Sequence, residues 1–416
     1  MSVWHVNRSG TRTVAVIVIC ACLFGCSFSV RRSSSTAKSK PTAKVSFVPR
    51  QTHIPGGHAV IPFKFVDNLP MVKVYINGQG LYRFMLDTGS TGLMLSPELV
   101  AQINPPVVRV EAVLSMRKGM RNLGYMRHIK LVELGGVKLQ DLNAVVVNTN
   151  NIPQTSGKVH GVLGLQVFAN CRLTIDYLEH QIALEALEKA QPLPIEDSNV
   201  LPLKSLVGGL VAVPVTINEK TLWCMIDSGQ ESAIAIPDKK AAILPLTTSP
   251  VRVPGSTSTF YQDRIPNRKA RLKDSLFLGC HELLSPIILV QGKKPMIGAE
   301  LLKHFVVTID QQAMMIRFMR ENSGPIEEPP SVRHHGFYFR RQDGIWVVTG
   351  AIQGVKLDKL SLKVGDQITR VNKMPTSQLT NTQLQTMVDK NSTLMLNIIR
   401  DRQKISIETP VTVLVP

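Results

Sequence analysis

Two stretches of this chain share one pattern, in which an apolar strand runs directly into Asp-Thr/Ser-Gly. Residues 82–91 read YRFMLDTGST, and residues 222–229 read LWCMIDSG. In such a turn Asp accepts backbone hydrogen bonds and Gly allows a positive φ. A single match is weak, because ordinary surface turns use the same residues. Two matches, each directly after an apolar strand, indicate a repeated unit.

The similarity extends on both sides of these turns. Each is preceded by an alternating apolar run that ends in Asn, which is typical of a hairpin strand. The copies are 140 positions apart at the aspartates and 134 at the last matching motifs, a shift small enough for loop insertions. The chain therefore predicts two β-rich lobes. The matching segments are 71–77 with 211–218, 131–136 with 275–280, 162–164 with 296–298, and 173–176 with 307–310.

With these motifs the chain resembles the pepsin-like and retroviral-type aspartic proteases, in the bacterial form with two retropepsin-like lobes on one chain. The resemblance implies a mainly β fold of two acid-protease β-barrel lobes in tandem. It also implies an aspartic endopeptidase that acts on protein or peptide substrates. The residues that carry it are the catalytic pair Asp87 and Asp227, with Thr88, Gly89, Ser90, Ser228 and Gly229 supporting the pair.

The chemistry of such a pair follows from electrostatics. Two carboxyl groups in near contact cannot both ionise, so they share one proton. The ionised member takes a proton from water, which attacks the peptide carbonyl, and the protonated member stabilises the oxyanion. We therefore expect no metal and no cofactor. The expectation has two requirements: the carboxyl groups must meet, and water must reach them.

The second turn departs from the family pattern. Gln230 stands where the family usually has Ser, Thr or Ala, whereas Ser90 is a typical occupant of the first turn. One hypothesis is an asymmetric pair in which Asp87 is the ionised member. The alternative is a catalytically inactive peptide-binding or scaffold protein that retains the protease fold.

In this family a β-hairpin flap covers the substrate. The candidate in lobe one is residues 117–125, with Gly119, Gly124 and Tyr125, and the candidate in lobe two is residues 254–260. Glycines at a hairpin tip suit a lid that opens. They suit an ordinary surface turn equally well.

The N-terminus resembles a targeting segment. Basic residues precede an apolar run, and Cys26 follows Leu-Phe-Gly as in a bacterial lipobox, where the cysteine is lipidated. The alternative is an uncleaved membrane anchor. Either predicts attachment to a membrane, and we expect a periplasm-facing lipoprotein of the bacterial cell envelope.

The formal net charge of +18 suggests nucleic-acid binding, but its distribution argues against that function. Residues 1–66 hold nine Lys or Arg and no Asp or Glu, so half of the excess charge lies in the N-terminal segment. No helix-turn-helix, zinc-finger spacing or aromatic–basic interleaving accompanies it. We expect no nucleic-acid partner.

The C-terminal part resembles a PDZ domain, on the strength of residues 362–372 with their Gly-Asp turn. The resemblance implies a peptide ligand added to a sheet edge, with its carboxylate held by backbone N–H groups. Its peptide loop is expected at Gly336, Phe337, Tyr338 and Phe339. The predicted boundaries are 1–26 for the signal peptide or anchor, 27–57 for a flexible basic tether, 58–188 for lobe one, 189–200 for a linker, 201–320 for lobe two, 321–335 for a second linker and 336–416 for the PDZ domain.

Overall fold

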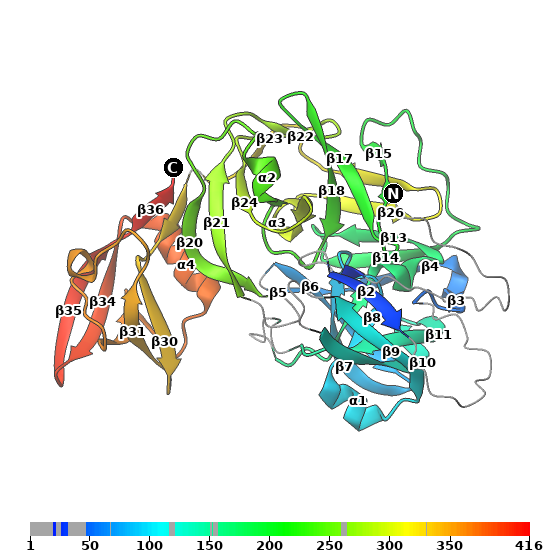
Figure 1. The fold of residues 1–416 in the computed structure, drawn as a ribbon, viewed down its shortest axis with the longest axis horizontal. Coiled ribbons are helices and arrows are strands. Elements are labelled where there is room, and N and C mark those ends of the chain that lie inside the picture. The colour runs from blue at the N-terminus through cyan, green and yellow to red at the C-terminus, as the bar shows by residue number, and fades with distance from the viewer. Residues whose placement is uncertain are drawn as a thin grey trace, which may run out of the picture.

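A computed structural model describes residues 20–21, 26–31, 47–66, 68–115, 121–149, 152, 157–258, 264–329 and 331–416. Figure 1 shows two strand-rich lobes beside each other and a smaller domain next to the second lobe. The expected fold class is confirmed: the chain is mainly β, with two lobes and a small α+β domain. None of the described helices has the length and hydropathy needed to cross a bilayer.

Lobe one is a closed barrel. Its sheet runs β10-β11-β8-β12-β7-β6, and β10 also pairs with β6, so the ends of the sheet meet. The hairpin between β6 and β7 turns at Asn77 and Gly78, both with positive φ, as the sequence predicts. The elements are β5 (Lys64–Val66), β6 (Leu69–Ile76), β7 (Gln79–Asp87), β8 (Leu93–Leu95), α1 (Pro97–Ile103), β9 (Val107–Ser115), β10 (Arg121–Leu134), β11 (Val137–Val146), β12 (Gly161–Gly164) and η3 (Leu165–Phe168).

Lobe two repeats this plan as an open half-barrel. The single 14-residue strand β10 of lobe one corresponds here to two strands, β21 and β22, separated by a polar stretch around Asp274. Because β21 pairs with β24 and β22 with β17, no continuous described strand closes the sheet, and the expected second barrel is only half formed. The elements are β16 (Lys204–Ser205), β17 (Val211–Ile217), β18 (Lys220–Asp227), β19 (Ile234–Ile236), α2 (Asp238–Ala241), β20 (Val251–Ser258), β21 (Arg264–Arg271), β22 (Leu276–Leu278), β23 (His281–Leu284), β24 (Ile287–Val290), β25 (Met296–Gly298), α3 (Ala299–Leu302) and β28 (Ile326–Glu327).

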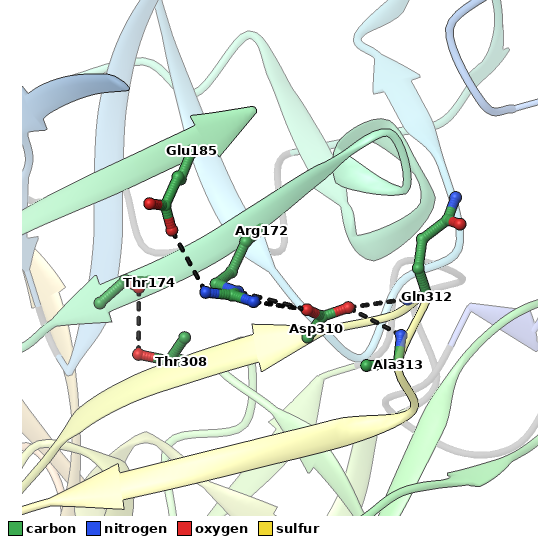
Figure 2. Close-up of polar contacts among 7 residues, drawn as sticks. All are labelled: Arg172, Thr174, Glu185, Thr308, Asp310, Gln312 and Ala313. Carbon is green, nitrogen blue, oxygen red and sulfur yellow. Dashed lines mark hydrogen bonds and ion pairs between the residues drawn. The ribbon is translucent and has the colours of Figure 1, made fainter. Parts of the chain in front are cut away.

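A six-stranded sheet joins the lobes. At its centre β13 and β26 run antiparallel, and Thr174 pairs with Thr308, its counterpart in the repeat. Their hydroxyls lie 3.1 Å apart, so the approximate twofold axis passes between them (Figure 2). The strands, in order across the sheet, are β15 (Val200–Pro202), β27 (Met315–Met319), β26 (Val306–Asp310), β13 (Cys171–Asp176), β14 (Gln181–Ala186) and β4 (His58–Pro62).

The C-terminal domain packs its own core around Trp346, Phe337 and Leu396. Its helix α4 begins with a capping box between Thr380 and Gln383. The elements are β29 (Val332–His334), β30 (Phe337–Gln342), β31 (Ile345–Ala351), η4 (Leu357–Leu360), β32 (Gln367–Val371), β33 (Met374–Pro375), α4 (Asn381–Lys390), β34 (Thr393–Arg400), β35 (Gln403–Pro410) and β36 (Thr412–Val415).

The segments expected as tether and linker are more structured than predicted. Within residues 27–57, Phe47 and Ile54 are buried, and β3 (Gln51–His53) pairs with β11, so lobe one begins before residue 58. Ile326, in the second expected linker, is buried on lobe two, and β29 pairs with β36 of the C-terminal domain. The sequence did not predict these contacts, because Phe47, Ile54 and Ile326 are scattered apolar residues in largely polar segments and form no strand-like or helix-like pattern. The remaining short elements are β1 (Cys20–Ala21), β2 (Cys26–Arg31), which pairs with β9, and η1 (Pro55–Gly57).

Candidate active site

Asp87 and Asp227 stand at equivalent places in the two lobes. Each is the last residue of a central strand, β7 or β18. Beside each runs a parallel strand that ends in a triplet of two apolar residues and Gly, which is residues 162–164 in lobe one and the matching residues 296–298 in lobe two. Gly164 therefore pairs with Asp87 and Gly298 with Asp227. The triplets predicted from the sequence therefore flank the aspartate turns.

The residues after the aspartates cross-link the lobes. Thr88 N donates to Ser228 Oγ at 2.9 Å, and Ser228 N donates to Thr88 Oγ1 at 3.0 Å. The two hydroxyls then donate across the interface, Thr88 Oγ1 to the carbonyl of Ile226 at 3.0 Å and Ser228 Oγ to that of Leu86 at 2.9 Å. These four reciprocal hydrogen bonds are all buried and fix the two turns against each other.

The glycines allow the carboxyl groups to come close. A Cβ built on Gly229 would lie 2.6 Å from Cγ of Asp87, and one on Gly89 would collide with the carboxyl of Asp227. Each carboxyl therefore lies over the glycine of the opposite turn. Each glycine N–H also donates to the aspartate of its own turn, Gly89 to Asp87 Oδ1 at 2.9 Å and Gly229 to Asp227 Oδ1 at 3.1 Å. The requirement that residues 140 positions apart meet is satisfied.

The fourth position makes the pair asymmetric. Ser90 Oγ donates to Asp87 Oδ2 at 2.5 Å, whereas Gln230 turns away and donates through Nε2 to Ser232 Oγ. Asp227 Oδ2 is buried and receives no hydrogen bond from a donor in the described part of the chain. A proton on Asp227, donated to Asp87, satisfies this oxygen.

The pKa shifts follow the same asymmetry. Burial raises the pKa of both carboxyl groups, because each is desolvated. For Asp87 the hydrogen bonds from Ser90 and from Asp227 act in the opposite direction and limit the rise. For Asp227 the neighbouring Asp87 adds to burial and raises the pKa well above its usual range. The hydrogen bond from Ser90 thus favours Asp87 as the ionised member of the pair and Asp227 as the protonated one.

Access of water is a separate matter. Asp87 and Asp227 both have an exposed fraction of 0% in this structure. The expected catalysis requires that water reach the carboxyl groups, and this requirement is not met in this conformation. Catalysis by this pair needs another conformation in which water and peptide reach the carboxyl groups.

The expected flaps are hairpins where the chain is described. In lobe one β9 and β10 pair antiparallel, with Gly124 opposite Ala112 and Tyr125 opposite Glu111. In lobe two β20 pairs with β21 in the same way. Gly119 lies outside the described residues. Cys26, the predicted lipidation site, is the first residue of β2.

One residue near the aspartate pair has no signal in the sequence. Tyr177 follows β13 in the sheet between the lobes, and its buried hydroxyl lies on the side of Ser228 and the two aspartates but has no hydrogen-bond partner in the described part of the chain. Burial raises the pKa of Tyr177 far above its usual value, so the hydroxyl stays protonated. Its ring packs edge-on against Phe63 and Phe65. Tyr177 comes 50 positions before Asp227 in sequence, and only the pairing of β13 with β26 brings it there.

The peptide loop of the C-terminal domain differs from the expectation. Phe337, Tyr338 and Phe339 belong to β30 and pair with β31, so only Gly336 precedes the strand. Phe337 and Phe339 face the domain core, and Tyr338 is exposed, which is the alternation of a strand. The residues before β30 are instead His334, His335 and Gly336.

Comparison with known protein families gives two matches. Residues 72–167 match the aspartyl protease family, and residues 331–399 match the PDZ domain family. The first match runs from β6 through the Asp87 turn to η3, and the second includes β29. The chain thus contains an aspartyl protease domain and a C-terminal PDZ domain.

Two solved structures align with parts of the chain. Basic 7S globulin from soybean has a TM-score of 0.39 and 12% sequence identity, over 65% of this chain and 95% of the globulin. A retropepsin-like aspartic protease from Rickettsia conorii has a TM-score of 0.23 and 17% identity, over 33% of this chain and 94% of the protease. No curated protein sequence matches the chain.

Proposed function

We propose that the protein is an aspartic endopeptidase that hydrolyses peptide bonds with water activated between Asp87 and Asp227. The observation that carries the proposal is the reciprocal bonding of Thr88 and Ser228, which holds two buried carboxyl groups face to face. A pair held in this way shares one proton, which is the state that acid–base hydrolysis needs.

The asymmetry assigns the steps. Asp87, stabilised as an anion by Ser90, takes a proton from the attacking water. Asp227 donates a hydrogen bond to the carbonyl oxygen as negative charge develops there. It then gives its proton to the leaving nitrogen as the C–N bond breaks, and the proton that Asp87 took from water remains as the one proton of the pair. The threonine–serine network below does not touch substrate in this scheme; it positions the carboxyl groups.

Burial of the pair adds a condition. Since neither carboxyl is exposed, we propose that the β9–β10 hairpin moves to admit substrate, as lids do in other hydrolases. Covering the site also excludes water around the reacting groups, which strengthens their electrostatic interactions.

The test is hydrolysis of a denatured protein mixture by the full chain between pH 3 and 7, with and without pepstatin. Asp87→Asn and Asp227→Asn should each abolish cleavage, because neither variant can share one proton between two carboxyls. Asp141→Asn, which changes an exposed aspartate of lobe one, should cleave as the wild type does. Cleavage that survives in either of the first two variants contradicts the proposal.

A second candidate is a peptide-binding protein without turnover. Two observations favour it: the side chain of Gln230 bonds to Ser232 instead of the Asp227 carboxyl group, and both carboxyl groups are covered. It predicts no cleavage at any pH. A column of immobilised peptides should still retain the wild type and Asp227→Asn alike.

We further propose that the PDZ domain recognises peptides and that the N-terminus attaches the protein to the cell envelope membrane, through lipidated Cys26 or an uncleaved segment. The second proposal rests on the sequence pattern alone. Labelling cells with a radioactive fatty acid tests it: label lost in Cys26→Ser supports lipidation, and membrane association that persists without label supports the anchor. A protein released entirely in soluble form contradicts both.

A further inference from the structure

Two adjacent histidines lead into the first sheet strand of the PDZ domain. β29 ends at His334, β30 begins at Phe337, and Gly336 between them has a φ of +88°. The N–H of Gly336 donates to Nδ1 of His334 at 2.9 Å, and its carbonyl accepts from Ile352 N at 3.0 Å. A side chain two positions earlier thus occupies the backbone donor of Gly336.

That donor is at the place where a peptide carboxylate is expected. β30 is the first strand of the order β30-β31-β32-β34-β35, and its other edge has no partner strand among the described residues. Peptides that add to such an edge have their terminal carboxylate held by backbone N–H groups at its beginning. While His334 accepts the Gly336 N–H, a carboxylate cannot.

The surroundings keep both imidazoles neutral. Their ring centroids are 3.8 Å apart, and His335 packs against Phe337 at 4.4 Å and Phe339 at 5.7 Å. Nδ1 of His335 is buried and has no hydrogen-bond partner in the described structure. Burial lowers the pKa of His334 to about 4, and burial together with His334 lowers the pKa of His335 well below its usual value.

No described charged group offsets this desolvation by pairing with either ring. Arg333, the neighbour on β29, directs its guanidinium to the carbonyls of Asp389 and Asn391 at the end of α4. β31 and β36 present no charged side chain. The charged residues of the other adjoining elements are Arg340 and Arg341 on β30, Asp358 and Lys359 on η4, and Asp389 and Lys390 on α4, and none of them forms an ion pair with His334 or His335 in the described residues.

We propose that His334 is an internal cap on the peptide-carboxylate site of the PDZ domain, and that protonation of its imidazole opens the site to peptides with a free C-terminal carboxylate. The inference rests on the proposed peptide binding by this domain. Neutral imidazole has one acceptor nitrogen, whereas the imidazolium has two donors and cannot accept the Gly336 N–H. The protonated ring therefore leaves the N–H free and adds a positive charge beside it.

Ligand and proton then bind cooperatively. A carboxylate bound at the Gly336 N–H favours the charged imidazole, and the charged imidazole favours the carboxylate, in equal measure. Peptide capture by the PDZ domain thus increases toward acid pH. An aspartate pair also holds its shared proton at acid pH.

The test measures binding of a fluorescent ten-residue peptide with an apolar last residue to the full chain carrying Asp87→Asn, which prevents cleavage. We expect the free-carboxylate peptide to bind about tenfold more tightly at pH 4 than at pH 7, the gain of one charge-assisted hydrogen bond. The amidated peptide should show no such change. His334→Phe, which keeps an aromatic ring without an acceptor or a charge, should bind more tightly than the parent at pH 7 and should show no gain between pH 7 and pH 4. His58→Phe, which removes an exposed imidazole of lobe one, should behave as the parent does.

A second measurement does not depend on ligand. With ¹⁵N-labelled histidine and glycine, the imidazole nitrogens of His334 and the amide of Gly336 should titrate together, with a midpoint near pH 4. If His334→Phe binds no better at pH 7, or if the Gly336 amide does not follow His334, the cap is disproved while peptide binding stands. If no peptide binds to either protein at either pH, peptide recognition by the PDZ domain fails and the cap fails with it.

Discussion

Position four of the aspartate turns is the place where the two halves of the site differ most. Ser90 completes the hydrogen bonding of Asp87, and Gln230 leaves Asp227 with an unpartnered oxygen. A hydrogen bond to the charged form of a carboxyl lowers its pKa, and a missing one raises it. The same backbone turn therefore favours the anion in lobe one and the acid in lobe two.

Replacing Ser90 by Ala removes the donor to Asp87 Oδ2. The pKa of Asp87 should rise, so the acidic limb of the profile of kcat/KM against pH should move to higher pH by about one unit, since a hydrogen bond to a charged group contributes about 1.5–3 kcal/mol. Gln230→Thr is the matched variant in lobe two. It adds a donor to Asp227, so the alkaline limb of the same profile should move to lower pH. An acidic limb unchanged by Ser90→Ala contradicts the assignment of Asp87 as the base.

Replacing Thr88 by Val keeps the shape of the side chain and removes its hydroxyl. The N–H of Ser228 then loses its acceptor in a buried site, and the free energy of unfolding should fall by about 1–3 kcal/mol. Urea unfolding measures the loss, and kcat should fall with it because the carboxyl groups are no longer held in register. Thr88→Ser, which restores the hydroxyl, should recover most of both, and equal losses in the two variants would argue against the network.

At this scale the aspartates and their neighbours were predictable, because each follows its strand directly in sequence. Tyr177 and the cap at His334 were not. Tyr177 reaches the site only through the pairing of strands from different lobes, and a histidine that accepts from a glycine two residues later has no pattern that separates it from an ordinary loop.

Among the elements, the sheet between the lobes determines how the two turns meet. Arg172 on β13 donates to Asp310 on β26 through Nε at 3.2 Å and Nη2 at 2.9 Å, with 8% and 6% of the side chains exposed (Figure 2). The other oxygen of Asp310 accepts from the backbone of Gln312 and Ala313, so the carboxylate is fully bonded. A buried pair with this geometry resists separation of the lobes, because either partner alone would be an unpaired buried charge.

Arg172→Met leaves Asp310 without its cation, and we expect the free energy of unfolding to fall by about 3–5 kcal/mol. Glu185→Gln is the control, because Glu185 contacts Arg172 at 3.3 Å from a partly exposed position and such a pair contributes about 0–1 kcal/mol. Both are measured by urea unfolding. Equal small effects would show that the pair does not hold the lobes together.

Most strands were predictable from apolar alternation and Asn-Gly turns, but their partners were not. Closure of lobe one depends on a 14-residue strand that bonds to both neighbours, and its interruption in lobe two follows from polar residues whose effect appears only in three dimensions. The peptide loop of the PDZ domain was predicted at residues 336–339, whereas in the structure it ends at Gly336 and the strand begins at Phe337. The sequence could not show this, because Gly336 and the aromatic residues after it fit a loop or a strand equally well until the pairing with β31 is known.

In the whole molecule, hydrogen bonds connect the PDZ domain directly to lobe two, in addition to the connecting segment of the chain. Arg271 on β21 donates to the carbonyls of Ser285, Pro329 and Pro416 at 2.7–2.8 Å, joining lobe two, the connecting segment and the end of β36. Figure 1 shows β20 and β21 at the edge of lobe two that faces the PDZ domain. Because β20 and β21 form the lobe-two hairpin, the attachment connects the PDZ domain to a candidate flap.

Removing residues 331–416 should therefore affect more than peptide capture. We expect kcat/KM for a long peptide with a free carboxylate to fall about tenfold, while that for a short internal peptide changes less than threefold, since only the long substrate engages both sites. Parallel losses for both substrates would indicate a purely structural domain, and circular dichroism of the truncated protein checks that the lobes remain folded.

The axis between Thr174 and Thr308 has one more consequence. In an assembly of two identical halves, every substitution is made twice, so Ser90 could not coexist with Gln230, nor could a lone Arg172–Asp310 bond lie opposite Val306 and Asp176. When both halves belong to one polypeptide, a residue can be replaced in one half and kept in the other. In a single chain the residue at position four can therefore differ between the two turns, so the two aspartates can have different hydrogen-bond partners and different pKa values.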